Sequence, residues 1–379
     1  IVATPSGAWT LYQVDGGHNF LNLTDRSLRF DTNGNPHVVY GGKNLYYTYY
    51  NGTTWNLSLV DAAPGVGEYA ALALDSSNRP RISYYDATNR SLKFAYWDGA
   101  TWHITTVDTP FTSMGDLLPS NLHHMQAAAD PYRATAYPEN AVGLYTSIAV
   151  DANNGVHITY YDTTAYSNPN NPYGVLKYAY WNGVTWSFDT IDDRNNVGVE
   201  NSLAIKPGTT LPCVSYLIEL YDDLRYACKQ LDGDWKVETV DGSVEQNDPP
   251  KNVGSFSSLA FDSNGNPHIS YYDFSSGDLK YAYKKSDSWT RSAIDTSGDV
   301  GTFTSIAVNK SNRVYISYID ETNGNLNQAD SSDWVPEKVT SLGNLGGRYT
   351  SIAIDKNGRQ GIVYYRIDTA KLYYTPWGG

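Results

Sequence analysis

The chain has 379 residues, a formal net charge of −13 and an aromatic content of 14%, with 33 tyrosines and 10 tryptophans. The negative charge excludes nucleic acid as a partner, because phosphate backbones are bound by clustered Lys and Arg, and it argues against docking on an anionic membrane. No apolar run approaches the roughly 20 residues of a spanning helix, so no membrane span is expected. Aromatic residues favour strands and the 32 glycines favour turns, so the composition predicts an all-β protein.

The first fifteen residues contain a single strand pattern. Residues 7–15 read GAWTLYQVD, in which a Trp is followed by a terminal Val-Asp. The chain begins at Ile1 rather than at Met, which is explained most simply by a cleaved secretory signal. We therefore expect a secreted, extracellular protein.

From residue 27 onward the chain repeats a unit of four short strands. The first strand of each unit has the pattern Ser-Ile-Ala-Val-Asp. Its seven copies are Ser27–Asp31, Ala71–Asp75, Ser147–Asp151, Ser202–Lys206, Ser258–Asp262, Ser305–Asn309 and Ser351–Asp355. Asn-Gly pairs follow several of these segments and supply the positive φ of tight hairpins. A period of about 46 residues with insertions is typical of four-stranded propeller blades.

The seventh unit is incomplete, since it ends at its third strand with KLYYTPWGG. The strand pattern of residues 1–15 supplies the missing fourth strand. The sequence thus predicts a single domain over 1–379, a seven-bladed β-propeller of four-stranded antiparallel blades whose ring is closed by the N-terminal strand. An open solenoid is the alternative. The same strand, added to a neighbouring copy instead, would produce self-association.

The two cysteines fall in one blade. Cys213 begins the second strand of blade four and Cys228 ends its third strand, at positions directly opposed across the hairpin. Opposed side chains lie about 4.5–5.5 Å apart, close to what a disulfide requires. We expect a disulfide, which would support export; two buried free thiols are the alternative.

Two long insertions identify a candidate site. Residues 109–142 lie between blades two and three, and residues 163–174 lie within blade three, in loop types that emerge on the same face of a propeller. Long loops on a rigid scaffold often carry binding sites. The candidate ligand-binding residues are His123, His124, Tyr132, Arg133 and Tyr166. Arg would neutralise a uronate, and Tyr or His would move protons if the protein were a lyase; packing of the loop is the alternative.

Two further sets of residues lie toward the same face. The second strand ends in a carboxylate in four blades, at Asp86, Asp162, Asp273 and Asp320. These residues would bind Ca²⁺ as a ring, or accept hydrogen bonds from their own turns. Aromatic residues open the first strand and should rim the channel, at Tyr69, Tyr145, Phe256, Phe303 and Tyr349. They would stack on sugar rings or pack blade against blade.

The turns before the fourth strand resemble a known repeat. They read NGTTW (51–55), DGATW (98–102) and NGVTW (182–186), similar to the end of the Asp-box of sialidase-like propellers, with Tyr50, Trp97 and Trp181 at the position of the motif Asp. The chain thus resembles secreted bacterial and archaeal propellers of the BNR type. The resemblance implies glycosidases, polysaccharide lyases, lectins or scaffolds as relatives. The arginine triad of sialidases is not placed in this sequence, so sialidase activity does not carry over.

Three functions follow as hypotheses. The first is a secreted, non-enzymatic, lectin-like module that recognises carbohydrate or a cell-surface polymer through one propeller face. The second is a polysaccharide lyase or glycosidase with its site under residues 109–142. The third is a structural subunit of an extracellular layer or filament, and the fold by itself does not choose among them.

Overall fold

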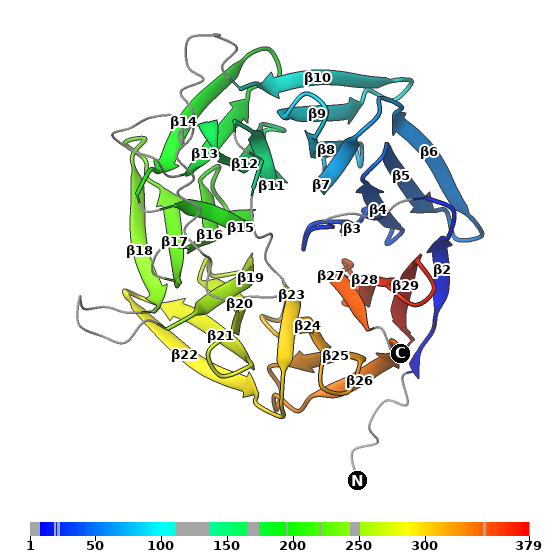
Figure 1. The fold of residues 1–379 in the computed structure, drawn as a ribbon, viewed down its shortest axis with the longest axis vertical. Coiled ribbons are helices and arrows are strands. Elements are labelled where there is room, and N and C mark those ends of the chain that lie inside the picture. Colours follow the sequence, from blue (N-terminus) through cyan, green and yellow to red (C-terminus); the bar gives the residue numbers. More distant parts are fainter. Residues whose placement is uncertain are drawn as a thin grey trace.

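The computed structural model shows seven four-stranded antiparallel sheets arranged in a ring, which confirms the predicted propeller (Figure 1). It describes residues 8–18, 20, 23–110, 137–138, 140–164, 174–194, 196–219, 222–242, 251–343 and 346–378. All regular elements in these ranges are strands. The described residues also contain no helix long and apolar enough to cross a bilayer.

In six blades the four strands follow each other in sequence order from the channel to the rim, and in blade seven the N-terminal strands take the outermost position (Figure 1). The innermost strands are β3 (Leu28–Phe30), β7 (Val66–Leu74), β11 (Val142–Val150), β15 (Val197–Ile205), β19 (Val253–Phe261), β23 (Val300–Val308) and β27 (Gly347–Ile354). The second strands are β4 (Pro36–Gly41), β8 (Pro80–Asp86), β12 (Val156–Asp162), β16 (Pro212–Ile218), β20 (Pro267–Asp273), β24 (Val314–Asp320) and β28 (Gln360–Arg366). The third strands are β5 (Leu45–Tyr50), β9 (Ser91–Trp97), β13 (Val175–Trp181), β17 (Asp223–Lys229), β21 (Asp278–Lys285), β25 (Asn325–Asp330) and β29 (Lys371–Gly378). The outermost strands are β6 (Trp55–Asp61), β10 (Trp102–Asp108), β14 (Trp186–Asp192), β18 (Trp235–Asp241), β22 (Ser288–Asp295), β26 (Glu337–Ser341) and, in blade seven, β1 (Ala8–Trp9) with β2 (Tyr12–Asp15).

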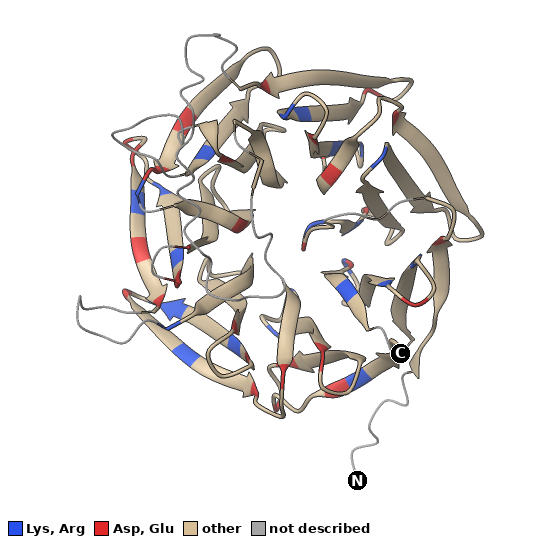
Figure 2. Ribbon diagram, viewed as in Figure 1, with Lys and Arg blue, Asp and Glu red and all other residues tan. Residues whose placement is uncertain are grey.

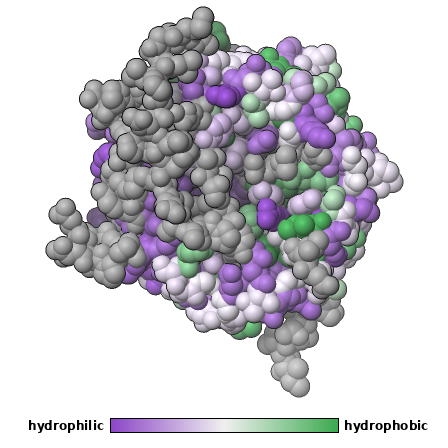
Figure 3. All heavy atoms as spheres, in the orientation of Figure 1, coloured by the Kyte–Doolittle hydropathy of each residue, from purple (hydrophilic) through white to green (hydrophobic). Residues whose placement is uncertain are grey.

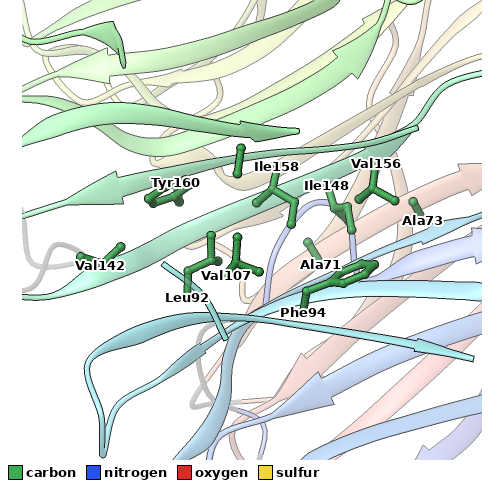
Figure 4. Close-up of a cluster of buried hydrophobic side chains, with 11 residues drawn as sticks. Ala71, Ala73, Leu92, Phe94, Val107, Val142, Ile148, Val156, Ile158 and Tyr160 are labelled. Carbon is green, nitrogen blue, oxygen red and sulfur yellow. The ribbon is translucent and has the colours of Figure 1, made fainter. Parts of the chain in front are cut away.

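The hydrophobic core lies between neighbouring blades. Second strands such as β12 are buried along their whole length, because both of their faces meet another sheet. Between blades two and three, Phe94 and Val107 of one blade pack against Ile148, Ile158 and Tyr160 of the next (Figure 4). Each blade therefore stabilises its neighbour, and the ring is stable as a closed unit.

The N-terminal strands complete the last blade. Tyr12 pairs with Tyr374 and Gln13 with Tyr373 in antiparallel register along β29, and Ala8 pairs with Gly378 further on. In Figure 1 the blue β2 lies at the outer edge of the red blade. The closing strand predicted from residues 1–15 is thus observed over Ala8–Asp15, apart from the short interruption between β1 and β2.

Two local predictions have clear outcomes. Cys213 and Cys228 are paired directly across β16 and β17 and form a disulfide, with Cα atoms 4.0 Å apart. The first-strand boundaries were wrong in blades two to seven, because β11 and its equivalents there begin four or five residues earlier than the Ser-Ile-Ala-Val segment. A bulge inside the strand interrupts the alternation of side chains and hides this extension in the sequence.

Candidate functional site

A repeated bulge turns one side chain per blade toward the channel. In blades two to seven this residue has a positive φ between 50° and 58° although it is not glycine. These residues are Tyr69, Tyr145, Glu200, Phe256, Phe303 and Tyr349. Such a conformation costs roughly 1–3 kcal/mol per residue. Five of these residues are the predicted rim aromatics, which lie inside their strands rather than at the strand starts.

These residues line a cavity of about 200 Å³ at the mouth of the channel, which we call the cup. Its lining residues are Leu23, Thr24, Asp25, Tyr69, Tyr145, Glu200, Asn201, Phe256, Ser257, Phe303, Thr304, Arg348, Tyr349 and Thr350. Charged residues are dispersed around the whole ring (Figure 2), and the described surface mixes hydrophilic and hydrophobic residues (Figure 3). The cup is therefore distinguished by its aromatic lining and not by a charged patch.

The aromatic lining forms two groups of rings. Tyr69 and Tyr145 contact each other with ring centroids 4.7 Å apart. On the other side, Phe303 lies 4.5 Å from Phe256 and 5.1 Å from Tyr349. Glu200 occupies the equivalent position in blade four, between the two groups, and accepts a hydrogen bond of 2.7 Å from the backbone N–H of Phe256.

The floor of the cup is made by the segment before β3. Ser202 and Ser258 each donate a hydrogen bond of 2.7 Å to Asp25 Oδ2. Ser351 donates to the backbone carbonyl of Asp25 at 2.8 Å. Arg26 extends to the same side and donates to Ser202 Oγ at 3.0 Å. Because these serines belong to blades four, five and seven, the segment crosses the channel and closes it below the cup.

A tyrosine cluster supports one wall of the cup. Tyr137, near the end of the first insertion, packs against Tyr145 with ring centroids 5.9 Å apart and donates a hydrogen bond of 2.7 Å to Glu219. Tyr161 donates to Asn196 at 2.6 Å in the same cluster. Burial raises the pKa of Tyr69 and Tyr137 well above the usual value of 10. Both hydroxyls therefore stay protonated near neutral pH and act as hydrogen-bond donors.

The candidate residues of the two insertions lie outside the described residues. This applies to His123, His124, Tyr132, Arg133 and Tyr166, whose role stays a prediction. The neighbouring Tyr137 is described, and its contact with Tyr145 connects the end of the first insertion to the cup.

The four proposed calcium ligands accept hydrogen bonds from their own turns. Asp86 accepts from Asn89, Asp162 from Thr164, Asp273 from Ser275 and Asp320 from Asn323, with backbone distances of 2.7–3.0 Å. Lys177 also lies 2.6 Å from Asp162. Within the described ranges, no group of three His, Cys, Asp or Glu is placed to hold a metal ion. Calcium binding stays a prediction, and these contacts match the turn-stabilising alternative.

Sequence reasoning missed the polar residues of the cup. Asp25 and Glu200 stand two residues before Ser27 and Ser202, exactly as Tyr145 stands two residues before Ser147. Aligning this position across the seven units would have found both carboxylates. Arg348 could not be found in this way, because it stands one residue before the bulge residue Tyr349 and so lies outside the repeated position. It lies at the exposed edge of the cup.

Comparisons with known proteins bear on the fold. No family model and no curated protein matches the sequence. Among solved structures, the chain is similar to a PL25 ulvan lyase bound to a -[GlcA(1-4)Rha3S]- ligand, with a TM-score of 0.61, 12% identity and coverage of 98% of this chain and 96% of that one. It is also similar to the polysaccharide lyase Uly1, with a TM-score of 0.55, 11% identity and coverage of 96% and 90%. A fungal alcohol oxidase of the AA5 family has a TM-score of 0.55, 9% identity and coverage of 98% and 76%. At these identities the likeness shows the propeller fold.

Proposed function

We propose that this protein is a carbohydrate-binding propeller that holds a sugar in the cup. The observation that carries the proposal is the set of five aromatic rings that bulges turn into one cavity beside hydroxyl and amide groups. Aromatic faces pack against the C–H faces of a pyranose, while the tyrosine hydroxyls of the cup provide hydrogen bonds to sugar hydroxyls. Strain repeated in six blades is expected where it serves a site.

Two further observations support this proposal. The similar solved structures include polysaccharide lyases, so the same fold handles carbohydrate in other proteins. The disulfide favours an oxidising compartment, where extracellular polysaccharides and cell-surface polymers are found. We infer that the protein acts outside the cell.

The experiment compares the full chain with cup variants on a glycan array, followed by calorimetry with the best glycan. Tyr349→Leu and Tyr69→Leu should weaken binding by roughly tenfold, or about 1.4 kcal/mol, because each removes one stacking face. Phe188→Leu is the matched control, since Phe188 is an exposed aromatic residue on the outer strand β14. Loss of binding in the control, or unchanged binding in both cup variants, would reject the cup as the site.

The same glycans should be incubated with the protein while the absorbance of unsaturated uronate is followed. The proposal of a binding module predicts no increase in this absorbance. A sustained increase that Tyr349→Leu abolishes would instead make the protein a lyase acting in the cup.

A further inference from the structure

The floor of the cup presents a buried carboxylate to any ligand. The side chain of Asp25 is only 10% exposed. Its Oδ2 atom accepts hydrogen bonds from Ser202 and Ser258 and lies 3.3 Å from Arg26 Nε. Its Oδ1 atom accepts no hydrogen bond from the residues that the structure describes, although Asp25 lines the cup. This Oδ1 atom keeps accessible surface in the cup, so the floor is suited to a hydrogen-bond donor carried by the ligand.

The walls above this carboxylate favour a positive charge. Aromatic rings have negative faces, which attract ammonium groups that lie within about 6 Å of the ring centre. Five such rings line the cup, and Glu200 adds a second carboxylate among them. Several aromatic rings with acidic residues between them form the kind of cage that proteins use for ammonium ligands.

Among the described residues that line the cup, one side chain, that of Arg348, carries a positive charge. Arg348 is an exposed residue at the edge of the cup. Burial raises the pKa of Glu321 above its usual value, and the positive charge of Arg348 partly opposes this rise. Arg26 lies below the floor, where it pairs with Asp25 Oδ2 and bonds to Ser202. The interior therefore presents carboxylates and aromatic faces to a ligand, and its cations lie at the edge and beneath the floor.

We propose that the cup is an ammonium-binding cage, and that its carbohydrate ligand is an amino sugar with a free amino group whose ammonium hydrogen-bonds to Asp25 Oδ1. This inference rests on the proposed carbohydrate-binding function and specifies its ligand class. A uronate or a sulfated sugar would bring its negative charge toward Asp25 and Glu200, so acidic polysaccharides should bind less tightly in this cup.

The test uses the full chain and two trimers that differ in charge and acetylation. Binding of a glucosamine trimer and of its N-acetylated counterpart is measured by calorimetry at about pH 6.5, below the pKa of a sugar amine. The charged trimer should bind at least about tenfold more tightly, because the ammonium contacts both the rings and the carboxylate. Its advantage should shrink as salt is added, since part of the attraction is electrostatic.

Two variants test the carboxylates separately. Asp25→Asn and Glu200→Gln should each reduce the affinity for the charged trimer severalfold more than the affinity for the acetylated trimer, because only the charged trimer loses an ionic contact. Because Asp25 also anchors the floor through two serines, the melting temperature is measured for both variants, and Glu200→Gln tests the inference if Asp25→Asn unfolds. Equal binding of the two trimers by the wild-type chain would overturn the ammonium cage and leave carbohydrate binding intact. Failure of every glycan on the array, both trimers included, would overturn the proposed function itself.

Discussion

A single tyrosine hydroxyl forms a hydrogen bond between most pairs of neighbouring blades. In six blades the second-strand Tyr donates to the Asp that ends the outer strand of the preceding blade, at 2.6–2.8 Å. The pairs are Tyr40–Asp15, Tyr84–Asp61, Tyr160–Asp108, Tyr216–Asp192, Tyr271–Asp241 and Tyr318–Asp295. In the seventh, Thr340 takes the place of the Asp, opposite Leu326, and the buried hydroxyl of Tyr364 interacts with the Thr340 side chain without forming a hydrogen bond of good geometry.

This difference predicts unequal losses of stability for the same Tyr→Phe substitution in two blades. Tyr216→Phe removes a buried hydrogen bond and should lower the free energy of unfolding by about 1–1.5 kcal/mol. Tyr364→Phe removes a buried hydroxyl that makes only a poor contact with Thr340, so it should lower the free energy of unfolding clearly less than Tyr216→Phe does. Urea unfolding of both variants measures the two values. Equal losses would show that the hydroxyl of Tyr364 is as well paired as that of Tyr216.

Three buried histidines make stability depend on pH. His37, His157 and His268 occupy equivalent positions in their blades and contact the hydroxyls of Tyr47, Tyr178 and Tyr281. Burial is the largest cause that lowers the pKa of each below the usual 6.5, and a nearby Asp partly opposes it. The unfolded chain therefore binds these protons more readily than the folded chain does.

Stability should be full above pH 6.5 and should fall as the pH decreases below that value. The carboxylates contribute at lower pH, because the pKa values of Asp31 and Asp262 lie below the usual 3.8. Unfolding measured between pH 8 and pH 5 should show the loss, and His157→Gln should make the profile less steep. A flat profile in the wild-type chain would contradict this account.

At the scale of elements, the closing strand is the critical piece. β2 contributes Asp15, which accepts a hydrogen bond of 2.6 Å from Tyr40 in blade one, and Trp9 packs on Trp377 in blade seven with centroids 5.0 Å apart. Deleting residues 1–15 exposes the edge of β29 and removes the Tyr40–Asp15 hydrogen bond, while the inner strands of the first and last blades still pack together. The truncated chain should melt at a lower temperature and should self-associate, as measured by calorimetry and light scattering.

The closing strand could also be exchanged between copies of the chain, which would make the protein self-associate. Strand exchange between copies would give the full-length protein a dimer or a longer assembly that Trp9→Ala weakens. In the structure the strand completes the blade of its own chain, so the full-length protein should be a monomer at low concentration. A truncated protein that remains monomeric with an unchanged melting temperature would show that the closing strand contributes little.

Blade number, ring closure and the disulfide were predictable because they depend on register. The repeated Val-Asp ends and Asn-Gly turns align the strands, and this alignment placed Cys213 opposite Cys228. The bulge in the first strands was not predictable, because positive φ at Tyr145 or Phe303 follows from tertiary packing and not from residue type. The floor of the cup was missed for a similar reason, since Asp25 meets Ser202 and Ser258 only after the ring has closed.

At the scale of the whole molecule, the described end of the first insertion adjoins the cup. Tyr137 near the end of the first insertion contacts Tyr145 of the cup, and Thr164 at the start of the second insertion donates a hydrogen bond to Asp162 at the end of β12. The cup of about 200 Å³ is smaller than a typical ligand pocket of roughly 300–1,000 Å³. It therefore suits a single sugar unit, and a longer glycan must extend beyond it.

This arrangement predicts that glycan length separates the two surfaces. Replacing His123, His124 and Arg133 by Ala should weaken binding of a hexasaccharide by severalfold and leave binding of the single sugar unchanged, because only the longer glycan extends past the cup. Tyr349→Leu should weaken both ligands, because the cup holds the unit that they share. Calorimetry with each ligand gives the four affinities. If the insertion variant also binds the single sugar less tightly, these three residues belong to the cup itself. If it keeps full affinity for the hexasaccharide, they are not part of the binding site.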